Sequence, residues 1–388
     1  MDFQLTDEQE AIRSEVRRLC SRFDDDYWRE KDKSHSFPEE FYQAFAEGGW
    51  LGIAMPEEYG GAGCGITEAA LIMQEATASG GCAAAASTVH MNIFGANPLV
   101  VHGSAEQKAA YLPKIASGKI KVAFGVTEPE TGLDTTHLKT KAVRKGDHFV
   151  VDGRKVWIST AQVASKILLL ARTTPLEQVS RSTEGLSLFF TDLDRKRIDV
   201  REIDKCGRGA VDSNELFIDG LEVPVEDLIG EEGKGFRYLL DGLNPERILV
   251  AAESIGIGRV ALDRAARYAK ERVVFGRPIG QNQSVQHPLA DSWVRLQAAE
   301  LLVLKAAWMY DNGHPCGAEA NAAKYLAAEV GFQAADRAMQ TLGGFGYSRE
   351  YHVERYWREA KLFRIAPISP ELILCYIAER VLGLPRSY

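Results

Sequence analysis

The sequence predicts a multi-domain α+β protein: a helical N-terminal domain, a central β-barrel or β-sandwich domain, and a C-terminal helical bundle. Three observations predict this class. The chain has 388 residues, more than one buried core usually holds. Both ends carry long segments with helical patterns, whereas the middle carries short β-branched runs separated by turn residues. We therefore expect domains at residues 1–120, 121–229 and 230–388.

Helical signals dominate the first domain. Thr6 and Gln9 have the spacing of a capping box, in which each side chain bonds the backbone of the other residue. Ile12, Val16 and Leu19 then continue one helix face. Alanine-rich stretches at 68–86 and 105–117 predict further helices.

The second domain is expected to be a sheet. Residues 139–143 and 148–158 are strand candidates, and the Gly146-Asp147 pair between them suits a hairpin turn. Residues 167–171, 186–191 and 215–218 are three more short strand candidates. Several short strands with turns between them indicate a small barrel or sandwich.

Long helices are predicted in the third domain at 245–271, 284–312 and 318–342, with Pro288 as the expected start of the second. Gly256, Gly258 and Ala261 match the spacing of a dinucleotide-binding fingerprint, which requires a preceding strand. Because this segment lies within a helical pattern, we expect the glycines to admit a close neighbouring helix. A nicotinamide-binding loop is the alternative.

Composition excludes several classes of protein. The net charge is −8 with no concentrated Lys/Arg patch, which disfavours a nucleic-acid surface. The six cysteines include no C-x-x-C pair and the histidines no H-E-x-x-H, so we expect neither a disulfide framework nor a metal site. No apolar run approaches the ~18–20 residues of a membrane span, and the N-terminus lacks signal-peptide features. A cytoplasmic protein is expected.

Several segments suit ligand binding, and each has a plainer alternative. Residues 124–134 form a Pro/Gly loop after a strand, which suits a heteroaromatic ring and a phosphate or is only a surface loop. Trp157 could line a planar ligand or sit in the core. Glu246 beside Arg247 is a candidate general base or only a charge at a helix start. Segments 271–283 and 340–347 suit phosphate or are ordinary helix ends.

The order of these motifs resembles the acyl-CoA dehydrogenase family over nearly the whole chain. The motifs are V-T-E-P-x-x-G-x-D, K-x-W-I-S, N-x-E-R, E-R-x-x-F-G-x-P, Q-x-x-G-G-x-G-Y and R-x-x-R-x-A-K-L. The resemblance implies a C-terminal four-helix bundle and FAD bound between it and the β-domain, with part of the site from a second subunit. It further implies a homodimer or homotetramer, acyl-CoA as substrate and an electron-transfer flavoprotein as acceptor.

The resemblance also implies roles for individual residues. Those expected to contact FAD are Phe124, Val126, Thr127, Gly132, Trp157, Ser159, Arg272, Phe275, Gln283, Gln340, Gly343, Gly344 and Ser369. Those expected near the CoA substrate are Leu133, Asn244 and Arg247.

The implied reaction is α,β-dehydrogenation of the thioester to the trans-2-enoyl-CoA, with a carboxylate as base and the β-hydride passing to flavin N5. Many members carry that glutamate where this chain has Pro367, whereas a branch like isovaleryl-CoA and long-chain dehydrogenases has the x-E-R pattern that Glu246-Arg247 matches. We therefore expect Glu246 to be the base. Because proline has no N–H, we expect the FAD ribityl hydroxyl, together with a shifted donor such as the Ile368 N–H, to replace it as donor to the thioester oxygen. A desulfinase or oxidase of the same family, or a catalytically silent subunit, is the alternative.

Overall fold

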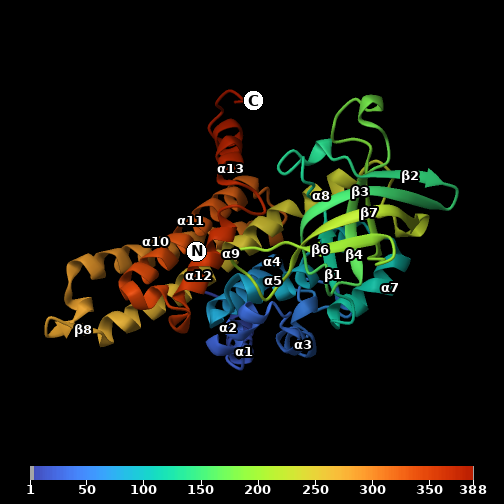
Figure 1. Cartoon of the computed structure of the whole chain (residues 1–388). Coiled ribbons are helices and arrows are strands. Elements are labelled where there is room, and N and C mark those ends of the chain that lie inside the picture. The colour runs from blue at the N-terminus through green and yellow to red at the C-terminus, as the bar shows by residue number, and fades with distance from the viewer. Residues whose placement is uncertain (1–3, 388) are drawn as a thin grey trace.

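The computed structural model describes residues 4–387 and has the expected order of helices, sheet and helices (Figure 1). Helices from both ends of the chain pack together, and the strands lie to one side of them. Secondary structure changes close to the expected boundaries, and we retain 1–120, 121–229 and 230–388 as the proposed domains. No helix within residues 4–387 is long and apolar enough to cross a lipid bilayer.

From residue 4 onward, the N-terminal part contains the α-helices α1 (Asp7–Cys20), α2 (Asp25–Ser34), α3 (Glu39–Glu47), α4 (Ile66–Ala76), α5 (Cys82–Ile93), α6 (Asn97–His102) and α7 (Ala105–Ala116). The predicted capping box is confirmed, since the Gln9 N–H donates to Thr6 Oγ1 at 3.2 Å and the Thr6 N–H donates to Gln9 Oε1 at 3.1 Å. Ile12 and Val16 are buried, which confirms the predicted face of α1.

The central part is one curled seven-stranded sheet in the order β1-β4-β2-β3-β7-β6, with β5 paired to β4. All five predicted strand segments are present, together with the strand before the 124–134 loop, but β6 was not predicted. Its sequence has only two apolar residues, and it lies at an edge of the sheet. The strands are β1 (Val122–Gly125), β2 (Lys141–Lys145), β3 (His148–Ser159), β4 (Lys166–Arg172), β5 (Leu186–Asp192), β6 (Ile198–Glu202) and β7 (Ser213–Pro224).

Strand β3 is irregular near its end. Its register against β7 shifts between Lys155 and Ile158, and Trp157 within this shift has a φ of 62°. Thr160, just after the strand, has a φ of 61°. Left-handed backbone is costly for residues with bulky or branched side chains, and such bulges often re-aim a side chain. Here the bulge leaves the Trp157 side chain 59% exposed.

The C-terminal part contains α8 (Gly235–Asp241), α9 (Leu243–Glu271), α10 (Gln283–Asp311), α11 (Gly317–Leu342), α12 (Val353–Phe363) and α13 (Pro370–Tyr376). Between α9 and α10 the short strands β8 (Val273–Val274) and β9 (Arg277–Pro278) form a hairpin. The expectation that Pro288 starts α10 was wrong. The helix begins at Gln283, so Pro288 is its sixth residue. Its missing N–H removes one hydrogen bond, to the Ser284 carbonyl, close to the start of the helix.

Helix α9 passes through the middle of the helical part, and two of its glycines face other helices closely. A Cβ on Gly256 would lie 1.9 Å from Thr77 Oγ1 and 2.4 Å from the Gln74 carbonyl oxygen. A Cβ on Gly258 would lie 3.1 Å from the Gly331 Cα of α11. The prediction of close helix packing is confirmed. The nicotinamide-binding alternative is wrong, since these glycines lie inside a 29-residue helix with no strand leading into them.

Gly256→Ala should therefore destabilise the fold by about 1–3 kcal/mol, because the methyl group meets backbone atoms that cannot move aside easily. The check is the midpoint of urea unfolding. Gly132→Ala is the matched control, since a Cβ there has no heavy atom within 4 Å, and its midpoint should match that of the parent chain. Equal midpoints for all three proteins would contradict the packing role of Gly256.

Candidate active site

The candidate base lies in the first turn of α9 and contacts a histidine of α5. The His90 Nε2 atom is 2.7 Å from Glu246 Oε2, and the His90 Nδ1 atom is 2.7 Å from Glu253 Oε1. His90 and Glu253 are 8% and 4% exposed, whereas the Glu246 side chain is 28% exposed. Glu246 is therefore the member of this trio that a ligand can reach.

Burial and charge act on His90 in opposite directions. Burial alone would lower the pKa of the imidazole, but the two carboxylates outweigh burial and raise the pKa well above its usual value. Burial raises the pKa of the Glu253 carboxyl, an effect that His90 opposes and the nearby Glu246 reinforces. The trio is thus one coupled group of charges between α5 and α9.

Asn244 and Arg247 lie beside Glu246 and contact each other. The Arg247 Nη1–H donates to Asn244 Oδ1 at 3.0 Å. Burial lowers the pKa of Arg247, and its buried Nε–H has no hydrogen-bond partner within the described residues. A partly buried guanidinium with an unused donor is suited to an anionic ligand.

The segment 366–369 lies against α11. The Lys324 Nζ donates to the Ile368 carbonyl oxygen at 2.6 Å, and Ser369 caps α13 by accepting from the Leu372 N–H at 3.3 Å. The Ile368 N–H donates to no acceptor in the described part of the chain. This donor is therefore free for a ligand, whereas Ser369 uses its hydroxyl in capping.

The predicted flavin-ring residues lie on the β-domain, where we group Phe124, Val126, Thr127, Gly132, Trp157 and Ser159 as the ring half-site. The Val156 N–H donates to the Thr127 carbonyl oxygen at 2.9 Å and joins the 124–134 loop to β3. Trp157 is exposed, so the core-tryptophan alternative is wrong. The buried Thr131 hydroxyl has no partner within residues 4–387, and nothing lies within 4 Å of a Cβ on Gly132. The unpaired Thr131 hydroxyl, the uncrowded backbone at Gly132 and the exposed Trp157 indole together fit a planar, polar cofactor.

Arg208 connects the ring half-site to α5. Its guanidinium donates to Ser159 Oγ at 3.0 Å, Ser87 Oγ at 2.9 Å and Ser213 Oγ at 2.6 Å. Ser87 lies one turn before His90 on α5. The predicted FAD residue Ser159 is thus held by a partly buried arginine that the sequence did not single out.

The other predicted FAD residues lie elsewhere, and we call Arg272, Phe275, Gln283, Gln340, Gly343 and Gly344 the hairpin half-site. Arg272 lies over the Phe345 ring at 5.5 Å, which brings the end of α9 to the end of α11. Glu246 and Arg272 are separated by about 39 Å along α9 at ~1.5 Å per residue. Figure 1 shows the hairpin at one end of the molecule and the sheet at the other. One chain therefore does not bring the two half-sites together.

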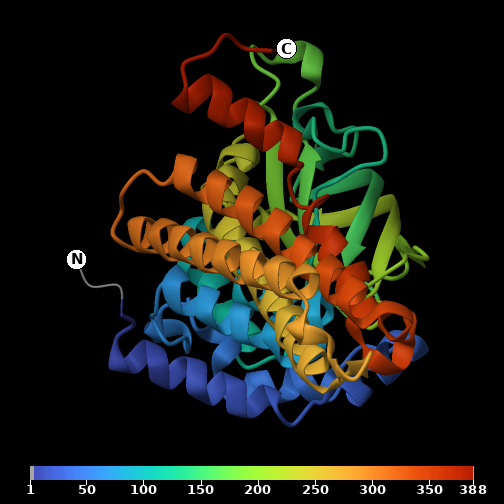
Figure 2. The same cartoon turned by 90° about the vertical axis from the view of Figure 1, so that its left-hand side faces the viewer.

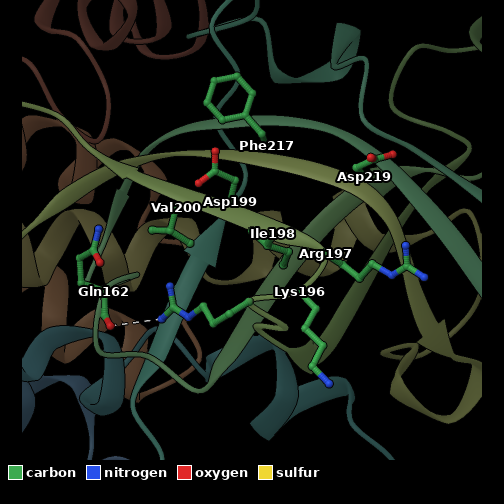
Figure 3. A pocket seen from close by; sticks show the side chains of 9 residues that line it. Gln162, Lys196, Arg197, Ile198, Asp199, Val200, Phe217 and Asp219 are labelled. Carbon is green, nitrogen blue, oxygen red and sulfur yellow. Dashed lines mark hydrogen bonds between the residues drawn. The ribbon is translucent and has the colours of Figure 1, made fainter.

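A surface hollow of about 690 Å³ lies on the β-domain beside β6 (Figure 3). Its lining includes Arg195, Lys196, Arg197 and Phe217, and the Arg195 guanidinium is bonded to main-chain carbonyls. No residue of either half-site lines this hollow. It is separate from the candidate active site.

Three sequence profiles match the chain in succession. They are "Acyl-CoA dehydrogenase, N-terminal domain" over residues 6–119, "Acyl-CoA dehydrogenase, middle domain" over 123–221 and "Acyl-CoA dehydrogenase, C-terminal domain" over 233–382. The chain is also 36% identical to acyl-CoA dehydrogenase fadE12 of Mycobacterium bovis, over 99% of this chain and 98% of that protein. The chain belongs to the acyl-CoA dehydrogenase family. Its members are flavin-dependent oxidoreductases that dehydrogenate acyl-CoA thioesters.

Solved structures of acyl-CoA dehydrogenase relatives share the whole fold. Glutaryl-coenzyme A dehydrogenase in complex with glutaryl-CoA has a TM-score of 0.94 and 33% identity, over 100% of this chain and 98% of that one. The FAD complex of PigA has a TM-score of 0.93 and 25% identity, over 99% of this chain and 100% of that one. These likenesses confirm the three-part helix–sheet–helix fold.

Sequence reasoning missed three residues of the site: His90, Glu253 and Arg208. His90 is a lone histidine in an alanine-rich helix, and 156 residues separate it from Glu246. One available signal was that Glu253 follows Glu246 by two helical turns, which places both carboxylates on one face of α9.

A second buried carboxyl, Glu359 of α12, belongs to the same charged region. Its Oε2 accepts from the Ala84 N–H at 2.9 Å, and its Oε1 has no partner among residues 4–387. Burial raises the pKa of Glu359 to about 7, an effect that the cation of Arg355 opposes. The folded protein therefore holds this proton more tightly than the unfolded chain does.

Because the folded pKa of Glu359 exceeds its unfolded value, its favourable contribution is complete below about pH 4.5 and is lost as pH rises through about 7. Glutamine does not ionise, so Glu359→Gln removes this pH-dependent loss of stability. Relative to the parent, the variant should gain about 3 kcal/mol in free energy of unfolding between pH 4.5 and 8. Denaturant titrations at both pH values check this, and a difference that does not change with pH would contradict it.

Proposed function

We propose that this chain converts an acyl-CoA thioester to the trans-2-enoyl-CoA, with Glu246 removing the α-proton. The observation that carries the proposal is the accessible Glu246 carboxylate in the first turn of α9, 28% exposed beside two buried partners. The other candidate position holds Pro367, which has no acid–base group. Glu246 is therefore the side chain best suited to act as general base.

The arrangement supports proton removal at one defined atom. Glu246 Oε2 is bonded to His90, which leaves Oε1 as the oxygen that accepts the α-proton. The Ile368 N–H is proposed to donate to the thioester oxygen, where negative charge develops as the α-proton leaves. The bond from Lys324 to the Ile368 carbonyl holds this segment in place.

FAD is the proposed cofactor, and the residues present fit it. The ring half-site offers the exposed Trp157 side chain and the open backbone at Gly132, and the neighbouring Thr131 adds a buried hydroxyl without a partner in the described part of the chain. When bound, FAD supplies the acceptor for the β-hydride at N5. A relative at 25% identity, PigA, is known as an FAD complex, which supports this assignment.

CoA recognition is assigned to Asn244, Arg247 and Leu133. The partly buried Arg247 guanidinium, held by Asn244, provides a positive charge next to the base. Leu133 is 55% exposed on the 124–134 loop and offers apolar contact only. The proposed CoA site thus has one fixed cation and a largely neutral rim.

A second copy of the chain is proposed to complete each FAD site. The hairpin half-site lies about 39 Å along α9 from Glu246. The ring half-site lies on the β-domain, at the other end of the molecule from the hairpin. Phe275 at the hairpin is 101% exposed, and α10 exposes Trp293, Val294 and Trp308, each more than half. Figure 2 shows α10 on the outside of the helical part. Large apolar side chains on one outer face indicate a protein contact, which a homodimer or dimer of dimers would cover.

An electron-transfer flavoprotein is the proposed acceptor, since acyl-CoA dehydrogenases as a family deliver electrons to such proteins.

Pro367 favours a second candidate function, that of a family member that carries out desulfination or oxidation with O₂ on a CoA thioester. The product distinguishes the two: enoyl-CoA supports dehydrogenation, whereas sulfite or peroxide supports the second candidate.

Glu246→Gln should slow substrate-dependent bleaching of the flavin by about 10²-fold or more, because the amide cannot accept the α-proton. Stopped-flow absorbance under anaerobic conditions, with a panel of acyl-CoA thioesters, measures this. Glu47→Gln, on the exposed end of α3, is the control and should bleach at the parent rate. Undiminished bleaching in Glu246→Gln would disprove the assignment of the base.

Mixed dimers test whether the half-sites combine across subunits. Glu246→Gln damages the catalytic end and Arg272→Ala the hairpin half-site, so each variant alone should be inactive. A dimer with one of each contains one intact site and one doubly damaged site, so the purified mixed dimers should show about half of the parent activity. Coexpressed, differently tagged chains purified in tandem provide the measurement. No recovery of activity in the doubly tagged dimers would show that each site belongs to one chain.

A further inference from the structure

The trio of His90, Glu246 and Glu253 has a protonation pattern that its geometry restricts. Both imidazole nitrogens lie 2.7 Å from a carboxyl oxygen. An ionised carboxylate can only accept a hydrogen bond. Both nitrogens of His90 must therefore carry a proton, unless one of the carboxyls carries it instead. The two negative neighbours favour the first arrangement, with an imidazolium between two carboxylates.

Counting charges shows what Glu253 contributes. With Glu246 ionised, the trio carries one net negative charge. After Glu246 accepts the α-proton, the trio is neutral, because the imidazolium is still paired with Glu253. Without the Glu253 charge, the same transfer would leave an unpaired cation at a site where His90 is 8% exposed. A buried uncompensated charge is strongly unfavourable.

We infer that His90 and Glu253 are positioning residues for the base: His90 holds one oxygen of Glu246, and Glu253 fixes the imidazole and balances its charge. The inference rests on the proposed role of Glu246. The Nε2–H bond leaves the second Glu246 oxygen free and aimed at the substrate. The Nδ1–H bond to Glu253 sets the ring orientation, in the way that a third group orients the base in other catalytic sites.

Other charges near the trio come from three elements. Arg247 on α9 interacts with Glu246 through its charge, and Arg208, in the loop before β7, interacts in the same way with Glu253. The charge of Glu359 on α12 also acts on Arg208. Burial lowers the pKa of His90, and the charges and hydrogen bonds of Glu246 and Glu253 raise it. Substitution of Glu246 or Glu253 should therefore change the protonation of the His90 imidazole.

Two substitutions of His90 separate its two bonds. In His90→Gln the amide nitrogen can occupy the place of Nε2 and keep the bond to Glu246. In His90→Asn the amide nitrogen can occupy the place of Nδ1 and keep the bond to Glu253 instead. A histidine that only joined α5 to α9 would tolerate both changes equally, whereas a positioning residue would not.

The experiment measures exchange of the substrate α-hydrogen for deuterium in D₂O by the flavin-loaded enzyme, with butyryl-CoA as probe and mass spectrometry as readout. His90→Asn should slow exchange by about 100-fold, since the base loses its orientation. His90→Gln should retain exchange within about tenfold of the parent. Urea-unfolding midpoints, measured in parallel, should be similar for the two variants because each keeps one bond.

Glu253→Gln supplies a readout that a structural role would not change. The amide oxygen can still accept from Nδ1–H, but the balancing charge is gone, so the exchange rate should fall by about tenfold. Loss of a nearby negative charge favours ionised Glu246, and the acidic limb of the pH–rate profile should move to lower pH. Loss of the imidazolium in His90→Gln should move that limb to higher pH.

The outcomes are distinguishable. Equal rates for His90→Asn and His90→Gln, or pH limbs that do not move in opposite directions, would overturn the inference and leave the base assignment intact. Unchanged exchange in Glu246→Gln would overturn the proposed function itself. His148→Asn is the matched control, because His148 contacts a single exposed carboxylate, Asp147, at the β2–β3 turn. This variant should exchange the substrate α-hydrogen at the parent rate.

Discussion

The close contact of α9 with α4 and α11 is the constraint on which the rest of the arrangement depends. At Gly256 and Gly258 the helix has no side chain, so neighbouring backbone atoms approach to distances that a Cβ would prevent. This contact fixes both the position and the rotation of α9. The first turn carries Glu246, the third turn carries Glu253 toward α5, and the last residue lies at the hairpin. A rotation of α9 would misplace all three together.

Much of the fold could be predicted because its signals are local. The capping box at Thr6, the Gly146 turn and the long uninterrupted helical pattern at 245–271 each depend on neighbouring residues, and the structure has all three. Strand β6 and the start of α10 were harder, because sheet-edge pairing and the tolerance of Pro288 depend on position within the element.

The site was predictable only in part, for the same reason. Residues of the ring half-site lie within short motifs, so their grouping on the β-domain follows from β1 and β3. Nothing local in the alanine-rich α5 indicates that His90 meets Glu246, because that contact depends on how two helices far apart in sequence pack. Arg208 is similar, since its three serine partners come from different parts of the chain.

The separation of the two half-sites within one chain has a consequence for assembly. If one FAD molecule bridges two subunits, cofactor binding and subunit association are linked by mass action, and each strengthens the other. Dilution would then release flavin as well as subunits, and excess flavin would hold the oligomer together. Cofactor retention would thereby depend on protein concentration. A folded single chain would hold no flavin until it associated with a second chain.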